Sequence, residues 1–427
     1  MKIYDLKNKI LGGDFDSKLV ELYDSKAILA QRNRYVNALD SFSKIFGDER
    51  DVNIYSVAGR SELAGNHTDH NCGKVIAASI NLDIIAIVAQ NNTNVINLKS
   101  EGFNQLSIDF SEYCEPNPTH YGTSASLIAG MCRGFADSGY KVGGFDAYCT
   151  SSVLRGSGLS SSAAFEDMIG NILNHEFNCG NVSNVEIAKL AQYSENVFFG
   201  KPCGLMDQVA CAYGGIVSID FADTKNPIIE QIDFDLTKAG YNLCIVDTGG
   251  NHADLTDDYA SVPLEMKSVA ALFGCTHLRQ CNKADVIART KEIREKCGDR
   301  AYMRALHFLN ENERVDAMKS GLKNNDLQSY FNGVKASGLS SFCYLQNVYT
   351  TKNVTEQGLS LALCLTDDFM KGKDGAFRVH GGGFAGTIQA YIPENYVEEY
   401  RALMNSVFGD GACLVLRVRQ HGAIKVN

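Results

Sequence analysis

The chain has 427 residues, 45% of them hydrophobic, which is enough to bury the core of two domains or of one large one. Its formal net charge of -10, without any run of basic residues, argues against a nucleic-acid surface and favours small molecules or proteins as partners. No apolar stretch approaches the length of a membrane span, and the charged N-terminus predicts no signal peptide.

The cysteines indicate a reducing compartment. There are 14 of them, scattered along the chain without a Cys-x-x-Cys pair, so zinc and redox motifs are not supported. We expect most of them to act as small buried apolar side chains. The expected protein is soluble and cytoplasmic, and either a monomer or a weak dimer.

The first half of the chain predicts an α+β unit. Apolar residues at helical spacing over 18–46 predict one or two amphipathic helices. A mostly antiparallel sheet is predicted from β-rich runs at 52–57, 75–80, 84–89, 95–98 and 106–110. Helical periodicity returns at 124–137, 161–177 and 185–199.

Residues 59–71 read Gly-Arg-Ser-Glu-Leu-Ala-Gly-Asn-His-Thr-Asp-His-Asn, directly after the first predicted strand. Two glycines permit a sharp turn and a close approach of the backbone to a ligand, and the polar side chains offer many donors and acceptors. The segment suits a hydroxyl-rich ligand. A polar turn that closes a hairpin is the alternative.

Residues 155–164 read Arg-Gly-Ser-Gly-Leu-Ser-Ser-Ser-Ala-Ala, between a predicted strand at 145–151 and a helical pattern. A glycine turn at a helix N-terminus presents unpaired backbone N–H groups to an anion, and a hydroxyl there can bind magnesium. This pattern favours a phosphate site, although a serine-rich helix cap is the alternative. No lysine-bearing Walker loop occurs.

Two later segments complete the set of motifs. Residues 201–208 read Lys-Pro-Cys-Gly-Leu-Met-Asp-Gln, and an acid in this apolar setting makes Asp207 a candidate base, or else a helix cap. Residues 379–387 contain Gly381, Gly382 and Gly383 in a row, which suits the close approach of a ligand or a second backbone, or else a flexible hairpin.

The second half changes character after a strand at 216–221. We expect strands at 228–232 and 243–246, helices over 257–369, and then strands at 377–380, 387–392 and 412–418 with a helix at 393–408. We therefore divide the chain into domains at 1–225 and 226–427. No Pro- or Gly-rich linker separates them, so they should be tightly docked, and the last strand can pair back onto the first domain.

In their order and spacing these four motifs resemble those of the GHMP small-molecule kinases and, within them, of the galactokinases. The first is similar to the signature Gly-Arg-Val-Asn-Leu-Ile-Gly-Glu-His-Thr-Asp-Tyr-Asn, the second to Gly-Leu-Ser-Ser-Ser-Ala, the third to Cys-Gly-Ile-Met-Asp-Gln and the last to Gly-Gly-Gly-Phe-Gly-Gly. The resemblance implies an α+β fold of two domains, S5-like and then ferredoxin-like, with the active site in the cleft between them. It also implies transfer of phosphate from ATP, with Mg²⁺, to the anomeric hydroxyl of a monosaccharide, galactose being the first choice.

The resemblance implies roles for individual residues. Asp207 would be the base or an electrostatic orienter of the hydroxyl, beside Arg60. Ser162 and Glu195 would bind the metal ion. The residues implied to hold the ATP phosphates are Gly156, Ser157, Gly158, Leu159, Ser160, Ser161 and Ser162. The residues implied to contact the sugar are Glu62, Asn66, His67, Asp69, Gly204 and Tyr259. The turn at Gly381, Gly382 and Gly383 would close on the site.

The sequence departs from the galactokinase pattern in the sugar segment. Asn66 stands where the pattern has Glu, and Glu62 stands where it has Asn. Because a site built around particular hydroxyls rejects analogues strongly, this change leaves open a kinase of another aldose or of an amino sugar. A catalytically silent sensor of sugar and ATP is a further alternative, which the presence of both Asp207 and Arg60 disfavours.

Overall fold

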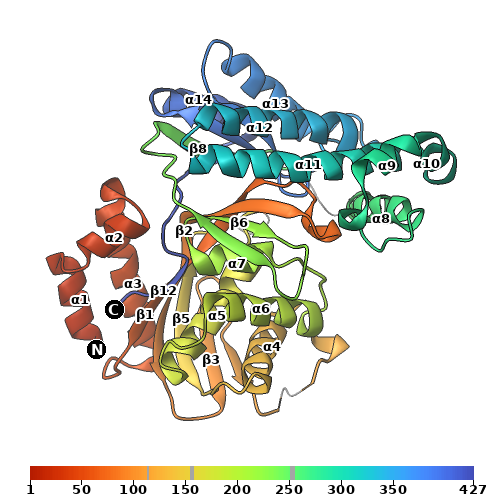
Figure 1. The fold of residues 1–427 in the computed structure, drawn as a ribbon. Coiled ribbons are helices and arrows are strands. Elements are labelled where there is room, and N and C mark those ends of the chain that lie inside the picture. Colours follow the sequence, from red (N-terminus) through yellow and green to blue (C-terminus); the bar gives the residue numbers. More distant parts are fainter. Residues whose placement is uncertain (113–114, 154–157, 251–254) are drawn as a thin grey trace.

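The computed structural model describes residues 1–112, 115–153, 158–250 and 255–427. Figure 1 shows a larger sheet with helices beside it in the first half of the chain, and a second layered unit above it that contains the long helices of the second half. The fold is therefore α+β, with two sheets, as the sequence predicts.

In the described residues the larger sheet has eight strands in the order β12-β1-β2-β5-β3-β4, with β6 paired to β2 and β7 to β6. All pairs are antiparallel except β3 with β5, so the predicted mostly antiparallel sheet is confirmed. Its strands are β1 (Asn53–Ala64), β2 (Lys74–Gln90), β3 (Val95–Ser100), β4 (Leu106–Asp109), β5 (Phe145–Ser151), β6 (Ile216–Asp220), β7 (Ile228–Ile232) and β12 (Ala423–Lys425).

Both faces of this sheet are buried. Along β1, Ile54 packs against the N-terminal helices, whereas Tyr55 faces the opposite core, and Ile85 and Ala86 alternate in the same way on β2. Such two-sided burial explains why these strands read as nearly continuous apolar runs. The N-terminal helices are α1 (Ile3–Gly12), α2 (Asp16–Leu22) and α3 (Ile28–Phe46), and the other face carries α4 (Ser124–Asp137), α5 (Ser161–Phe177), α6 (Asn184–Tyr193) and α7 (Met206–Tyr213).

Two strands are longer than predicted. β1 runs on through Ala64, so residues 59–64 of the first motif are strand and not a turn, and β2 is one strand where two were expected. The β1–β2 register shifts between Ala58 and Arg60 and again between Glu62 and Ala64. Bulges of this kind let a polar stretch remain in a ladder while its side chains are re-aimed.

The smaller sheet has the order β11-β8-β10-β9 in the described residues, all antiparallel. Cys244 of β8 packs with α13 and α14, whereas Leu243 faces the side of α11 and α12. The strands are β8 (Tyr241–Asp247), β9 (Ala376–His380), β10 (Thr387–Pro393) and β11 (Cys413–Leu416). The helices of this half are α8 (Thr256–Ala271), α9 (Lys283–Ala288), α10 (Thr290–Cys297), α11 (Asp299–Lys323), α12 (Leu327–Ser340), α13 (Gly358–Phe369) and α14 (Val397–Phe408).

The chain crosses between the two sheets twice. β7 lies beyond residue 225 yet pairs with β6, so the division expected at 225 and 226 falls within a hairpin of the larger sheet. The strand expected at 412–418 is β11 of the smaller sheet, and a further strand, β12, returns to pair with β1. No helix in the described ranges has both the length and the apolarity to cross a membrane.

Candidate active site

Arg60 and Asp207 meet in a two-pronged ion pair, although 146 residues separate them in the sequence. Arg60 Nε and Nη2 each lie 2.8 Å from a carboxylate oxygen of Asp207. Arg60 belongs to β1 and Asp207 to the first turn of α7, so the sheet and the helix N-terminus fix the pair between them. Burial lowers the pKa of Arg60, but the charge of Asp207 more than offsets this, and the guanidinium remains cationic.

The N-terminus of α5 touches the same pair. The hydroxyl of Ser160 donates a hydrogen bond to Asp207, and Arg60 donates one from Nη1 to the carbonyl of Gly158. The backbone N–H of Arg60 donates to the carbonyl of Leu159 at 3.1 Å. Ser160 has φ of 59°, a left-handed conformation that starts the helix directly beside Asp207. Gly156 and Ser157, also expected in the phosphate site, lie outside the described residues.

Ser161 and Ser162 occupy the first turn of α5 and are partly accessible. The helix therefore presents its N-terminal backbone and two hydroxyls beside the Arg60–Asp207 pair, an arrangement that suits a phosphate group.

Glu195 lies in a π-helical turn, Ser194–Phe198, and is 2% exposed. Its Oε1 is 3.2 Å from the ammonium of Lys201, and its Oε2 accepts a hydrogen bond of 3.0 Å from Gln208 Nε2. The carboxylate predicted to bind metal is thus neutralised by a lysine that is 63% exposed and free to swing into solvent.

Buried oxygen acceptors surround Glu195. Glu166 Oε1 and Gln208 Oε1 have no hydrogen-bond partner in the described chain, and Gln208 Nε2 bridges from Glu195 to Glu166 Oε2 at 3.3 Å. Burial and the charge of Glu195 raise the pKa of Glu166 well above its usual value. Oxygen-rich, donor-poor surroundings suit a hard cation such as Mg²⁺. Yet in the described ranges no three His, Cys, Asp or Glu side chains already converge on one point.

The sequence interpretation missed two acids of α5, Glu166 and Asp167. Asp167 is fully buried, and neither of its carboxylate oxygens has a hydrogen-bond partner in the described chain. Burial and the charge of Asp207 raise its pKa well above the usual value. The signal was available, because Glu166 follows Ser162 by one helical turn and adjacent acids interrupt an apolar helix.

The side chain of Asn66, which was expected to contact the sugar, forms its hydrogen bonds within the protein. It is fully buried: its Nδ2 donates to the carbonyl of Gly381 at 2.6 Å, and its Oδ1 accepts from Asn347 at 2.8 Å and from Ser341 at 3.1 Å. The oxygen and one N–H of this side-chain amide are therefore bonded within the protein. The sequence could not show this, because all three partners lie more than 270 residues away.

Glu62 is likewise turned inward. Its carboxylate pairs with Nη2 of Arg378, of β9, at 2.7 Å, and both side chains are buried. The expectation that Glu62 contacts the sugar is therefore not supported by its position. It acts as an internal counter-ion that joins β1 of the larger sheet to β9 of the smaller one.

The glycine turn after β9 is held by its carbonyl oxygens. His67 Nε2 lies 2.7 Å from the carbonyl of Gly382, and the hydroxyl of Tyr259 donates to the carbonyl of Gly383 at 2.7 Å. Burial lowers the pKa of His67 to about 4, so its ring is neutral and donates to that carbonyl. His67 and Tyr259, both expected to contact the sugar, thus anchor the turn.

Asp69 and Gly204 line a cavity of about 170 Å³. Gly204 precedes Asp207 by three residues in the sequence. A Cβ at Gly204 would lie 2.8 Å from Asp69 Oδ2, so glycine leaves that carboxylate room. The cavity is lined by Asp69, His70, Gln192, Cys203, Gly204, Leu205, Phe221 and Thr224. Two of the six residues expected to contact the sugar, Asp69 and Gly204, thus border a hollow that could receive one.

Two family descriptions match the chain. "GHMP kinases N terminal domain" covers residues 125–215, which include the N-terminus of α5 and Asp207, and "Galactokinase galactose-binding signature" covers residues 40–90, which include Arg60. A curated galactokinase of Clostridium acetobutylicum is 29% identical over 374 residues, 86% of this chain and 91% of the relative. One of Lactococcus lactis is 27% identical over 391 residues, 90% and 94% of the two chains.

The fold is similar to solved structures of the same kind. The crystal structure of Lactococcus lactis galactokinase complexed with galactose has a TM-score of 0.76 and 23% identity, and the match covers 92% of this chain and all of that one. A mevalonate kinase matches with a TM-score of 0.59 at 16% identity, over 85% of this chain and 98% of its own. These likenesses extend the shared architecture across both sheets.

The chain therefore resembles the GHMP kinases, in a family description that matches residues 125–215 and in its fold. The galactose-binding signature, and the relatives that match over 86% and 90% of this chain, are those of galactokinases. The chain matches the galactose-binding signature over residues 40–90, although Glu62 and Asn66, which lie in that range, direct their side chains into the protein.

Proposed function

We propose that this protein transfers the γ-phosphoryl group of ATP to the anomeric hydroxyl of a monosaccharide, with galactose as the preferred substrate. The observation that carries the proposal is the convergence of Arg60, Asp207 and Ser160 at the N-terminus of α5. A carboxylate, a cation and a helix N-terminus at one point provide what phosphoryl transfer needs, namely alignment and charge neutralisation.

The proposed reaction balances without a further reactant. The anomeric oxygen forms a bond to the γ-phosphorus while the bond from that phosphorus to the β,γ-bridging oxygen breaks and ADP leaves. The hydroxyl proton passes to Asp207 or, through it, to solvent. Because both carboxylate oxygens of Asp207 are held by Arg60, Asp207 acts largely by orienting the hydroxyl.

Two places in the site suit the two substrates. The sugar is proposed to occupy the cavity beside Asp69 and Gly204, and the phosphates to lie at Ser160, Ser161 and Ser162. Mg²⁺, when bound by Ser162 and Glu195, would neutralise phosphate charge. Lys201 must leave Glu195 for this to happen, and its exposure allows that.

The function is tested by ADP release with galactose, glucose, mannose, arabinose and galactosamine, and by the position of the phosphate from ³¹P NMR. We expect turnover with galactose and a product phosphorylated at the anomeric oxygen. Turnover with another aldose or with an amino sugar alone would change the substrate and retain the reaction. Binding of sugar and ATP without any ADP release would instead indicate a silent sensor.

Asp207→Asn provides the matched variant, with exposed Asp316→Asn as its control. We expect Asp207→Asn to lower kcat by about 10²–10⁴, the usual contribution of a positioned acid or base. An equal effect in both variants, or none in either, would show that Asp207 is not part of the reaction.

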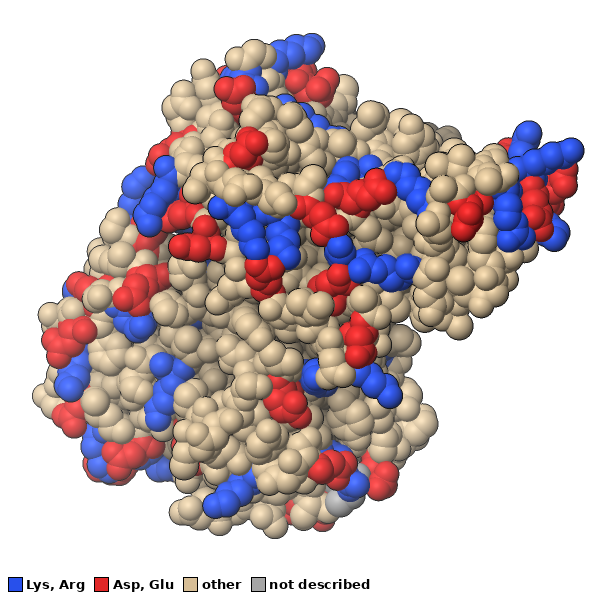
Figure 2. All heavy atoms as spheres, viewed as in Figure 1, with Lys and Arg blue, Asp and Glu red and all other residues tan. Residues whose placement is uncertain are grey.

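We also propose that the enzyme is cytoplasmic and works as a monomer or a weak dimer. Each cysteine in the described part of the chain is a free thiol, as expected in a reducing compartment. On the face shown in Figure 2, basic and acidic side chains are interspersed, which suits a protein whose substrates bind in an interior site. Cell fractionation and light scattering after gel filtration test both points.

A further inference from the structure

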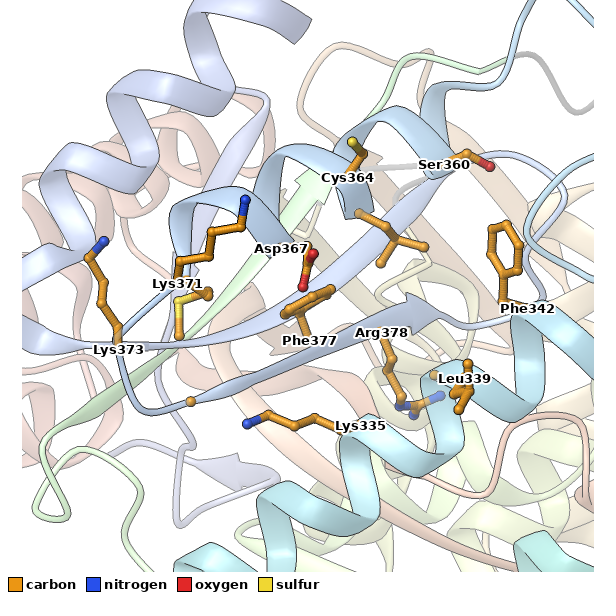
Figure 3. A pocket seen from close by; sticks show the side chains of 14 residues that line it. Lys335, Leu339, Phe342, Ser360, Cys364, Asp367, Lys371, Lys373, Phe377 and Arg378 are labelled. Carbon is orange, nitrogen blue, oxygen red and sulfur yellow. The ribbon is translucent and has the colours of Figure 1, made fainter.

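A second cavity lies away from the active-site pair, between α12, α13 and β9 (Figure 3). Its volume is about 680 Å³, within the range of about 300–1,000 Å³ typical of small-molecule sites. Its apolar lining comes from Leu339, Phe342, Leu363, Met370 and Phe377. Leu339 is 65% exposed and Phe342 42% exposed, so large apolar side chains on this wall are left open to water.

The charged groups of the cavity are mostly cationic. Its charged lining residues are Lys335, Lys371, Lys373, Arg378 and a single acid, Asp367. Lys371 pairs with Asp368, and Lys373 lies over the ring of Phe369. Figure 3 shows Lys335 extending from α12 along the hollow, whereas Asp367 comes from α13 on the opposite side.

Arg378 adjoins the cavity and forms an ion pair with Glu62. It is fully buried, and Nη2 is used by Glu62, but Nε and Nη1 have no hydrogen-bond partner in the described chain. Because these nitrogen atoms are shielded from solvent, a ligand in the cavity does not reach them, and the accessible positive charge of the cavity comes from its lysines.

We infer that this cavity binds a small amphipathic anion, with its apolar body against Leu339, Leu363 and Phe377 and its carboxylate or phosphate at Lys335. Nothing in the kinase reaction requires this site, so the inference is independent of the proposed function.

The test is calorimetric titration of the full chain with decanoate, decyl phosphate, decanol and decyltrimethylammonium. We expect the two anions to bind at least about tenfold more tightly than decanol, since one charge-assisted contact contributes on that order. The tighter of the two anions identifies the preferred head group. Binding of the cation as tight as that of the anions would overturn the inference.

Two pairs of variants locate the binding. Leu363→Trp fills the cavity and should abolish decanoate binding, whereas Leu361→Trp, on the exposed face of the same helix, should not. Lys335→Glu should weaken decanoate about tenfold or more and leave decanol unchanged, whereas Lys291→Glu on α10 should change neither. Thermal melting confirms that each variant is folded, and decanoate binding that survives in folded Leu363→Trp would contradict the inference.

Discussion

Asn66 and Gly381 are joined by a 2.6 Å hydrogen bond from the side-chain amide to the backbone carbonyl, which ties the first sequence motif to the last. The bond runs between residues 315 positions apart, from the segment after β1 to the turn after β9. Asn66 thus links the two halves of the molecule, and we expect it to contribute to stability.

Asn66→Ala should therefore lower the free energy of unfolding. The substitution removes the partner of the Gly381 carbonyl and of the Ser341 hydroxyl, and one of two partners of the Asn347 amide, at a cost of roughly 2–5 kcal/mol. Urea denaturation measures the loss, and Lys291→Ala, at a side chain of α10 that is 91% exposed, serves as the control. The order of preference among sugars should not change. A changed order at unchanged stability would show that Asn66 faces the substrate after all.

Glu62 and Arg378 should behave as one unit in a double-mutant cycle. Because the pair is buried, Glu62→Gln or Arg378→Met alone leaves an uncompensated charge and should destabilise the protein by about 3–5 kcal/mol. The double variant should recover a large part of that loss, since neither charge remains. Denaturation of the four proteins gives the coupling. Additive losses would show that the ion pair is not the source of the effect.

Most helices and strands could be predicted from the sequence because they have strong local patterns of apolar and turn residues. Phe145–Ser151, Ser161–Phe177 and Ile228–Ile232 coincide with the predicted segments, where apolar periodicity and turn residues agree. The continuation of β1 through Ala64 was missed because Gly59 and the polar residues after it imitate a turn. Hydrogen bonds to β2 hold these residues in a strand, and such pairing with another segment cannot be read from the residues themselves.

For the active site, too, the sequence indicated which residues take part but not how their side chains are oriented. The motifs indicated Arg60 and Asp207, and the structure brings them together. Which way a polar side chain points was beyond the sequence, since Glu62 and Asn66 are turned inward by partners on β9 and in the distant segment of Asn347. Asp167 was missed because its environment is an apolar interior that other elements build around it.

Asp167→Asn should change how stability depends on pH. The folded pKa of Asp167 is raised, so at pH below about 4 the group is protonated in both states and contributes nothing. As the pH rises, Asp167 ionises in the unfolded chain but stays protonated in the folded protein, so the free energy of unfolding falls. The variant should exceed the wild type by about 1 kcal/mol or more at pH 7, and the difference should vanish towards pH 4. Parallel curves from pH 4 to 8 in urea titrations would refute this, and exposed Asp410→Asn is the control.

Lys201→Met should reduce the Mg²⁺ concentration required for activity. The substitution removes the ammonium that lies 3.2 Å from Glu195, so a divalent ion no longer competes with it. The half-saturating Mg²⁺ concentration should fall by roughly threefold to tenfold, equivalent to about 1 kcal/mol for a partly exposed pair. Lys201→Arg keeps the charge and should leave it unchanged. A rise in the Mg²⁺ requirement of Lys201→Met would mean that the lysine assists binding of the metal or the nucleotide.

Gly383→Ala and Gly381→Ala should differ sharply, although both glycines have positive φ, 79° and 66°. Either alanine incurs the strain of a left-handed backbone, about 1–2 kcal/mol. At Gly381 no atom lies near the added methyl group, whereas at Gly383 the methyl would collide with the carbonyl oxygen of Asn347.

Gly383→Ala must therefore push the turn away from Asn347 and from the hydroxyl of Tyr259. We expect it to lose at least about 2 kcal/mol more stability than Gly381→Ala in urea, because buried polar groups lose their partners as well. Its kcat/KM should fall by tenfold or more, since the turn holds His67 and Asn66 in the segment after Arg60. Equal losses in the two variants would show that the turn is not fixed by these carbonyl contacts and that backbone strain alone governs its response.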